Sequence, residues 1–575
     1  MRFDVWAPRP ERVEVHADGS RFPMVRGDRG RWSAEVPAAG PGTRYGFVLD
    51  GEGPFPDPRS RHQPDGPHGL SQVVDTGAFA WTDGGWRAPE LADGVVYELH
   101  IGTFTPEGTF AAAARRLDAL AELGITHVEL MPVATFPGRH GWGYDGVDLF
   151  APHPAYGGPE GLAAFVDAAH RRGLAVLLDV VYNHLGPDGN YLGRFGPYFT
   201  DAHTTPWGEA VNLDRADSDQ VRRFFIDNAL FWLDEYHLDG LRIDAVHAMA
   251  DFSAIHFLEQ LAAEVRAMEA SSGRRLVLIA EDNRNDPRVV RRRERGGWGL
   301  DAQWSDDFHH ALHVALTAER DGYYLDFEGL GDLAAAIEGP FVYDGRYSPF
   351  RRAIHGAPPM GLPAGRFVVS LQTHDQVGNR AVGGRIAHLV SPGRARIGAA
   401  LMLLSPYVPM LFQGEEWGAS SPFLFFTDHQ DPALADAVRR GRREEFRAFG
   451  WEGDALPDPQ AEETFTRSRL DWDERDLPKH ARMLQWYRDL IGLRARTPGI
   501  GGLHSLPARA RFDAAEQWLV MDRGPLSVAA NIAGVPRRLP AGGDVALASD
   551  APLEQDADHV VLPPESAVVL ARPGA

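Results

Sequence analysis

Apolar and polar residues alternate along the first fifty positions of the chain. Apolar side chains recur at every second position in four short runs, at 3–7, 13–15, 32–36 and 45–49. This alternation is typical of strands that bury one face. Gly, Pro and Asp residues between the runs are turn signals. The pattern predicts an immunoglobulin-like β-sandwich over residues 1–90.

From residue 95 the pattern changes, because short apolar runs without alternation follow one another with helix-like segments between them. Runs such as AVLLDVV and LVLIA are typical of parallel strands that are covered on both faces. We expect strands at 95–104, 127–133, 175–181, 240–246, 276–281, 302–305, 367–373 and 407–412, and helices at 109–123, 161–173, 218–236, 253–270 and 393–404. This α/β pattern predicts a central (β/α)₈ TIM barrel with long inserted loops over residues 91–495.

Strand-like runs return near the end of the sequence, at 518–521, 526–531, 545–548 and 567–570. They predict a small C-terminal all-β domain over residues 496–575. The N-terminal residues have no apolar core of a signal peptide, and the longest apolar runs are broken by Gly, Ser and Pro. We therefore expect neither a leader nor a membrane span.

Charge and cysteine content narrow the possible functions. The sequence has 58 Lys and Arg against 80 Asp and Glu, a formal net charge of −22. This balance argues against nucleic acid or an anionic membrane as a partner. Cysteine is absent, which excludes disulfides and thiolate chemistry and fits a cytoplasmic location. No compact metal-binding motif is present, so we expect no metal and no cofactor, and the oligomeric state is left open.

Four apolar runs end in polar residues that could carry chemistry. These are Asp179 to His184, Arg242 with Asp244, Glu281, and His374 with Asp375. In a (β/α)₈ barrel the carboxyl ends of the strands meet at one mouth, so we expect these side chains to converge. A lone Asp at a strand end is more often a turn or cap residue, but that explanation is weak for all four positions together.

The types of residue in this set fit the cleavage of a glycosidic bond. A retaining mechanism needs a carboxylate nucleophile and a carboxylic acid. Arg242 and Asp244 lie two apart on a strand and share a face, so the guanidinium should keep Asp244 ionised. Glu281 follows an apolar run, and partial desolvation should help it to keep a proton. Asp375 could accept sugar hydroxyls. Asp179 lies mid-strand, and we expect it to hold the backbone or His184.

As a set these segments resemble the signature regions of the α-amylase family of glycoside hydrolases. The matching segments, in the order of the family, are DVVYNH (179–184), GLRIDAVH (240–247), AED (280–282) and THD (373–375). The resemblance implies that Asp244 is the nucleophile, Glu281 the general acid/base and Asp375 the stabiliser of the transition state.

The same resemblance assigns further residues to the substrate. It places Arg242, His184 and His374 around the reacting sugar and Tyr144, in HGWGYDG, under it. His247 stands where many members have a lysine on the leaving-group side, and Thr373 replaces a frequent Asn. Asn183 matches an Asn that binds calcium in many amylases, but no further ring of oxygen ligands is readable, so calcium is not predicted.

Two branches of the family share the predicted N-terminal sandwich. The segments at 136–162 and 412–429 resemble the branch that hydrolyses malto-oligosyltrehaloses more than the glycogen branching enzymes. We therefore expect a malto-oligosyltrehalose substrate, with trehalose and malto-oligosaccharides as products. A branching enzyme, a general amylase-type hydrolase and a non-catalytic glucan-binding scaffold stay open as alternatives.

Four further residues are candidates for contact with the substrate. Glu416 and Trp417 follow the eighth predicted strand and could form a wall that recognises the trehalose end. Trp142 and Trp207 could be stacking platforms for sugar rings. Each aromatic residue could equally serve packing, because large rings are usually buried.

Overall fold

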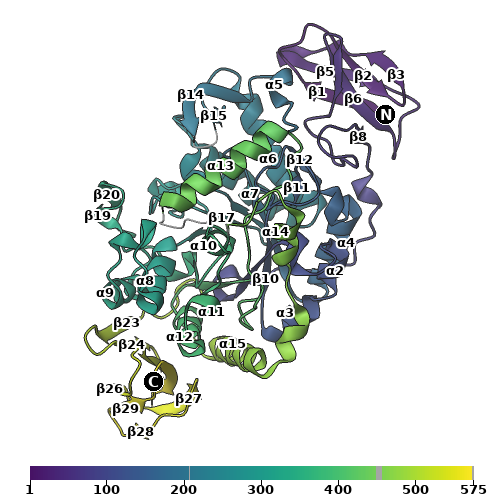
Figure 1. The fold of residues 1–575 in the computed structure, drawn as a ribbon. Helices are drawn as coiled ribbons and strands as arrows, with labels where there is room; N and C mark the ends of the chain where they lie inside the picture. The colour runs from purple at the N-terminus through teal and green to yellow at the C-terminus, as the bar shows by residue number, and fades with distance from the viewer. Residues whose placement is uncertain (206–207, 449–455, 573–575) are drawn as a thin grey trace.

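The computed structural model describes residues 1–205, 208–448 and 456–572, and a closed barrel of eight parallel strands forms its centre (Figure 1). The strands follow one another around the barrel in chain order, and the last pairs with the first. They are β9 (Val96–Leu99), β10 (His127–Leu130), β13 (Ala175–Val180), β16 (Gly240–Ile243), β17 (Val277–Ala280), β18 (Ala302–Trp304), β21 (Phe367–Ser370) and β22 (Val408–Phe412). The predicted (β/α)₈ barrel is confirmed.

Each of the eight predicted runs contains one barrel strand, but the first prediction was too long. Strand β9 ends at Leu99, and a short helix, α1 (Ile101–Phe104), occupies the rest of that run. The helix predicted at 109–123 is divided into α2 (Phe110–Ala114) and α3 (Leu117–Leu123). The other four predicted helices correspond to α4 (Gly158–His170), α6 (Ser218–Glu235), α7 (Phe257–Ser272) and α12 (Pro392–Leu403).

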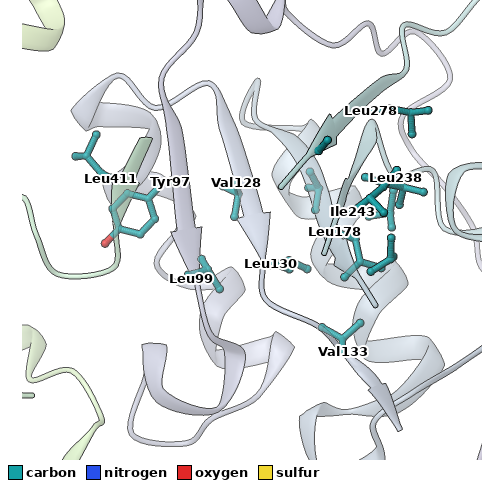
Figure 2. Packing of buried hydrophobic residues seen from close by; sticks show 14 of the residues in the cluster. Tyr97, Leu99, Val128, Leu130, Val133, Leu178, Leu238, Ile243, Leu278 and Leu411 are labelled. Atoms are coloured by element: carbon teal, nitrogen blue, oxygen red, sulfur yellow. The ribbon is translucent and has the colours of Figure 1, made fainter. Parts of the chain in front are cut away.

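The barrel strands are apolar on both faces because each face covers a separate core. Leu177, Ile279 and Met410 belong to a cluster inside the barrel. The alternate positions, such as Leu178, face the helices in a much larger outer cluster; Figure 2 shows part of it, including Leu99, Val128 and Leu130 on two neighbouring strands. Each fully buried Leu contributes about 1.5–3 kcal/mol, so the mouth of the barrel rests on a rigid frame.

The N-terminal region forms two sheets that pack together, as the alternation predicts. One sheet contains β1 (Arg2–Trp6), β5 (Arg31–Glu35) and β4 (Val25–Arg26); the other contains β3 (Ser20–Pro23), β2 (Val13–Ala17), β6 (Arg44–Leu49) and β7 (Glu52–Phe55), with β8 (Ser71–Gln72) paired to β6. Phe3, Val15 and Phe47 are buried between the sheets. An ion pair of 2.9 Å between Arg59 and Asp227 links this region to helix α6.

The C-terminal region is all-β and lies at the opposite end of the molecule from the N-terminal sheets (Figure 1). It follows helix α15 (Pro478–Arg496). Its larger sheet has the order β23 (Arg509–Asp513), β24 (Trp518–Arg523), β25 (Leu526–Asn531), β30 (Ser566–Ala571) and β27 (Asp544–Ala548); the smaller has β26 (Arg537–Leu539), β29 (Val560–Leu562) and β28 (Glu554–Gln555). None of the helices in the described ranges has the length and apolar character needed to cross a bilayer.

Candidate active site

The polar residues that end the barrel strands gather at one mouth of the barrel. Asp179 on β13 is the register partner of Arg242 on β16, and Ile243 is the partner of Ala280 on β17. The residues that follow these two strands, Asp244 and Glu281, therefore start from adjacent positions. His374 and Asp375 open the short helix α10 (His374–Gly378), which comes after β21.

Arg242 is the centre of the cluster. One of its terminal nitrogens, Nη1, lies 2.8 Å from Asp244 Oδ1 and 2.7 Å from Asp179 Oδ2, and the other, Nη2, lies 3.0 Å from Glu281 Oε2. Its guanidinium carbon lies 4.2 Å from the centre of the Trp304 ring. Burial alone would lower the pKa of Arg242, but the carboxylates raise it well above its ordinary value. A permanent cation thus holds Asp244 and Glu281 as close neighbours.

A turn of the backbone after Asp244 fixes the same two side chains from the other side. Ala245 has left-handed angles (φ 39°, ψ 51°), which cost a non-glycine residue roughly 1–2 kcal/mol. The turn directs the Ala245 N–H to Glu281 Oε2 at 2.8 Å. Asn183 donates its side-chain amide to Asp244 Oδ2 at 2.7 Å. Both carboxylates therefore have fixed orientations, and their side chains stay 11% and 19% exposed.

A chain of hydrogen bonds crosses the floor of the mouth from Glu98 to Asp179. The Nδ1 of His374 donates to Glu98 Oε1 at 2.5 Å, and its Nε2 donates to the Tyr144 hydroxyl at 2.8 Å. That hydroxyl donates in turn to Asp179 Oδ2 at 2.6 Å. Burial would lower the pKa of His374, but the charge of Glu98 and its hydrogen bond outweigh burial and raise it. These contacts favour the imidazolium form of His374.

Asp179 joins this chain to Arg242, and it does not hold His184. Its Oδ2 accepts from both Tyr144 and Arg242. Burial raises the pKa of Asp179 to about 7, although Arg242 opposes the shift. Asp179 was expected to hold the backbone or His184, but its Oδ2 accepts from the side chains of Tyr144 and Arg242 instead. Asn183 and the backbone of Tyr144 hold the His184 ring.

His184 and Asp375 follow opposite strands of the barrel, β13 and β21, and burial shifts the pKa of each toward its neutral form. Burial lowers the pKa of His184 to about 4, so its ring is neutral. Burial raises the pKa of Asp375, and nearby Glu281 adds to the shift. Asn379 donates to Asp375 Oδ1 at 2.7 Å. Thr373 caps helix α10 by accepting from the Asp375 N–H, which gives the threonine at this position a structural role.

Trp142 is a packing residue, so the prediction that it is a sugar platform was wrong. Its ring is 6% exposed and stacks on Phe423 at 5.3 Å. It meets the His374 ring edge-on at 5.5 Å, and its indole N–H donates to the carbonyl of Leu424 at 2.9 Å. Tyr144, by contrast, is partly exposed at the mouth, with its ring nearly parallel to His374.

Glu416 and Trp417 do not form a wall of the mouth, and this part of the prediction was also wrong. Each is 1% exposed. The hydroxyl of Tyr97 lies 3.1 Å from both carboxylate oxygens of Glu416, and the indole of Trp417 donates to Glu474 at 2.9 Å. Both side chains after β22 therefore have their polar partners in the interior of the protein. Burial raises the pKa of Glu416 to about 7.

The two remaining candidates have different positions. His247 lies in the turn η5 (Val246–Ala248) after the strand of Asp244, and it is half-buried. Within the described ranges, no hydrogen-bond partner approaches its Nδ1. Trp207 falls outside the described residues.

The structure adds two carboxyl groups that the sequence prediction missed. Glu98, within the apolar strand β9, holds His374. Asp306 opens helix α8 (Asp306–Thr317) directly after β18. Burial raises its pKa to about 8, and Glu281 and Asp375 both contribute, which places it beside them. In the described part of the chain, no three His, Asp or Glu side chains are grouped to hold a metal ion.

Comparisons with known proteins agree with this geometry. Residues 75–196 match a family model described as the alpha amylase catalytic domain, and residues 504–569 match a domain of unknown function, DUF3459. The chain is 48% identical to the malto-oligosyltrehalose trehalohydrolase of Rhizobium sp. (strain M-11), over 99% of this chain and 97% of that protein. It is also 48% identical to the enzyme of the same name from Mycobacterium tuberculosis (strain ATCC 25618 / H37Rv), over 96% of each.

A branching enzyme and a solved structure complete the comparison. The 1,4-alpha-glucan branching enzyme GlgB of Corynebacterium jeikeium (strain K411) is 33% identical, over 73% of this chain and 61% of that protein. The crystal structure of a Salmonella typhimurium protein assigned as an alpha amylase superposes with a TM-score of 0.92, at 41% identity, and covers 99% of this chain and 97% of that one.

Proposed function

This chain belongs to the malto-oligosyltrehalose trehalohydrolases of the α-amylase family, and we propose that Asp244, Glu281 and Asp375 carry out its reaction. The enzyme hydrolyses the α-1,4-glucosidic bond next to the terminal trehalose unit and releases trehalose, with retention at the anomeric carbon. One observation carries the assignment of residues: a single buried guanidinium contacts both Asp244 and Glu281.

Asp244 is the nucleophile in this proposal. A retaining mechanism needs the two carboxyl groups roughly 5–5.5 Å apart, and contact with the two ends of one guanidinium keeps them near each other. Arg242 and Asn183 donate to Asp244, which favours its ionised form. The carboxylate attacks the anomeric carbon, and the glycosyl group becomes bonded to Asp244 as the bond to the trehalose oxygen breaks.

Glu281 gives its proton to that leaving oxygen and so releases trehalose as a neutral sugar. In the second step Glu281, now a carboxylate, takes a proton from a water molecule that attacks the anomeric carbon. The bond to Asp244 breaks, the malto-oligosaccharide leaves, and both side chains return to their starting protonation states. The hydrogen bond from the Ala245 N–H keeps Glu281 on the side of the leaving oxygen through both steps.

Asp375, His374 and Tyr144 act on the reacting sugar. The half-buried Asp375 accepts from hydroxyls that move as the ring flattens, so its hydrogen bonds strengthen as positive charge develops. His374 is held as a donor by Glu98, and Tyr144 supplies a ring face beneath the sugar. A hydrogen bond to a charged group contributes about 1.5–3 kcal/mol, so a few such bonds supply a substantial part of the barrier reduction.

The test is the pair of substitutions Glu281→Gln and Asp244→Asn, each assayed for trehalose release from maltotriosyltrehalose. We expect kcat to fall by about a thousandfold or more in each, with an unchanged melting temperature as the control for folding. Activity within tenfold of wild type in either variant would remove that residue from its role. Maltopentaose, which has no trehalose end, is the matched substrate, and equal cleavage of the two substrates would favour a general amylase.

A further inference from the structure

Asp306 occupies a defined position between two of the proposed catalytic carboxyl groups. Strand β18 lies between β17 and β21 in the barrel. Gln303 is the register partner of Ala280, and Trp304 is the partner of Val368. The N–H of Ser305 donates to the carbonyl of Val368 at 2.8 Å. Asp306 therefore starts from the barrel rim between the segments that carry Glu281 and Asp375.

The side chain of Asp306 differs sharply from that of its neighbour Asp307. Asp307 Oδ2 accepts from the N–H groups of Val342 and Tyr343, at 2.6 and 2.8 Å, and from the amide of Asn285 at 2.8 Å. Asp306 is half-buried, yet its carboxyl group makes neither a hydrogen bond nor an ion pair with any residue in the described ranges. The hydrogen-bonding capacity of this half-buried carboxyl group is therefore not taken up by described protein groups and is available to a polar ligand.

The arrangement of the mouth indicates which part of the substrate reaches Asp306. The groups proposed to hold the reacting sugar follow strands β10, β13, β16 and β21; they are Tyr144, His184, Asp244, His374 and Asp375. Glu281, which directly follows β17, must reach the oxygen of the leaving sugar. The next strand beyond Glu281 is β18, so the segment that carries Asp306 lies beside Glu281 on the rim of the barrel.

We propose that Asp306 is a substrate-binding residue that hydrogen-bonds, as a neutral carboxylic acid, to hydroxyls of the leaving trehalose unit. This inference rests on the proposed function of Glu281 and Asp244. A neutral carboxyl group offers one donor and one acceptor, and a pair of sugar hydroxyls can satisfy both. Burial is the main cause that raises the pKa of Asp306 to about 8, with contributions from the neighbouring Glu281 and Asp375, and this favours the protonated form at neutral pH.

The test compares two substrates that differ only in the leaving group. Maltotriosyltrehalose loses trehalose, whereas α-maltotriosyl fluoride loses fluoride and places no sugar beside Asp306. We expect Asp306→Ala to lower kcat/KM for maltotriosyltrehalose about tenfold, the effect of one or two hydrogen bonds, and to change hydrolysis of the fluoride less than twofold. Asp306→Asn keeps a donor and an acceptor, so it should lose no more than about threefold on maltotriosyltrehalose.

Asp307→Asn is the control for folding, because Asp307 Oδ2 accepts from two backbone N–H groups and from Asn285. This variant should lower the melting temperature and act equally on both substrates. Equal losses on the two substrates in Asp306→Ala, or no loss on either, would overturn the inference. A loss in Asp306→Asn as large as in Asp306→Ala would show that the charge, not the neutral acid, is needed, and would also overturn it. Failure of the wild type to release trehalose would instead refute the proposed function.

Discussion

Replacing Glu98 by glutamine removes the negative charge that keeps His374 protonated. Glu98 is 1% exposed, and it accepts from both the ring and the backbone N–H of His374, at 2.5 and 3.0 Å. Glutamine keeps the size of the side chain and one acceptor oxygen. The substitution therefore alters the charge at this position with little change in packing.

The expected magnitude follows from the hydrogen bond that is weakened. A hydrogen bond to a charged group contributes about 1.5–3 kcal/mol, and every 1.4 kcal/mol corresponds to a factor of ten. Without the partner charge the imidazolium is no longer favoured in a buried position, so its donation to the Tyr144 hydroxyl beneath the sugar weakens. We expect Glu98→Gln to lower kcat by about 10–100-fold, with a smaller change in KM.

The assay is kcat for trehalose release between pH 5 and 9. In the wild type the pKa of His374 is raised, so its protonated form stabilises the fold. This contribution is complete below the ordinary histidine pKa of about 6.5. It is lost as the pH rises through the raised pKa. In Glu98→Gln the pKa falls, so the basic limb of the profile should move to lower pH. The difference in melting temperature between the two proteins should likewise shrink as pH rises.

Glu129 provides the matched control, because it is the register partner of Glu98 on the adjacent strand. It is equally buried, but neither of its carboxyl oxygens has a hydrogen-bond partner among the described residues. Burial, helped by the charge of Glu98, raises its pKa well above the ordinary value, which favours the neutral form. Glu129→Gln should leave kcat and its pH profile unchanged. An unchanged profile in Glu98→Gln, or the same shift in both variants, would refute the reasoning.

Three further substitutions test other parts of the structure. Trp417→Phe removes the hydrogen bond to Glu474 and should lower the free energy of unfolding in urea by about 1–2 kcal/mol, with kcat/KM unchanged. A tenfold fall in kcat/KM would mean that Trp417 contacts the substrate. Gly378→Ala would bring a methyl group within 2.0 Å of the Trp142 ring. Calorimetry should therefore show a loss of about 1–3 kcal/mol in the free energy of unfolding, and kcat should also fall. An unchanged melting temperature would contradict this packing. Arg61→Ala breaks a partly exposed ion pair with Glu235 and should cost at most about 1 kcal/mol; a larger loss in urea unfolding would mean that the sandwich depends on this contact.

The barrel could be predicted because its strands are apolar on both faces, so that each forms a short, continuous apolar run between more polar segments of the sequence. Helix α8 was not predicted, because its buried face carries His309 and His313, and histidine counts as polar in a hydrophobic pattern. The first strand was predicted too long since α1 is equally apolar. The domain bounds 1–90, 91–495 and 496–575 stay a prediction; helix α15 ends at Arg496 and the first C-terminal strand begins at Arg509.

The site was predictable where a polar residue ends an apolar run, and less so elsewhere. Glu98 stands inside the run VYEL, and this lone acid in a buried strand was a signal that could have been used. Asp306 follows a strand of only three residues, and its place at the start of a helix made it look like a cap. Glu416 was misplaced because a sequence does not show which way the chain turns after a strand, and here it turns to meet Tyr97.

The left-handed turn at Ala245 has a consequence for how the enzyme can change. Because this turn ties the main chain after one reacting carboxylate to the side chain of the other, the spacing between them is set by the backbone. Surrounding loops can therefore lengthen, shorten or change sequence without disturbing the chemistry, which leaves them free to adapt to sugars of other lengths. Glycine at position 245 would relieve the backbone strain, but it would also make the distance between the two carboxylates less fixed.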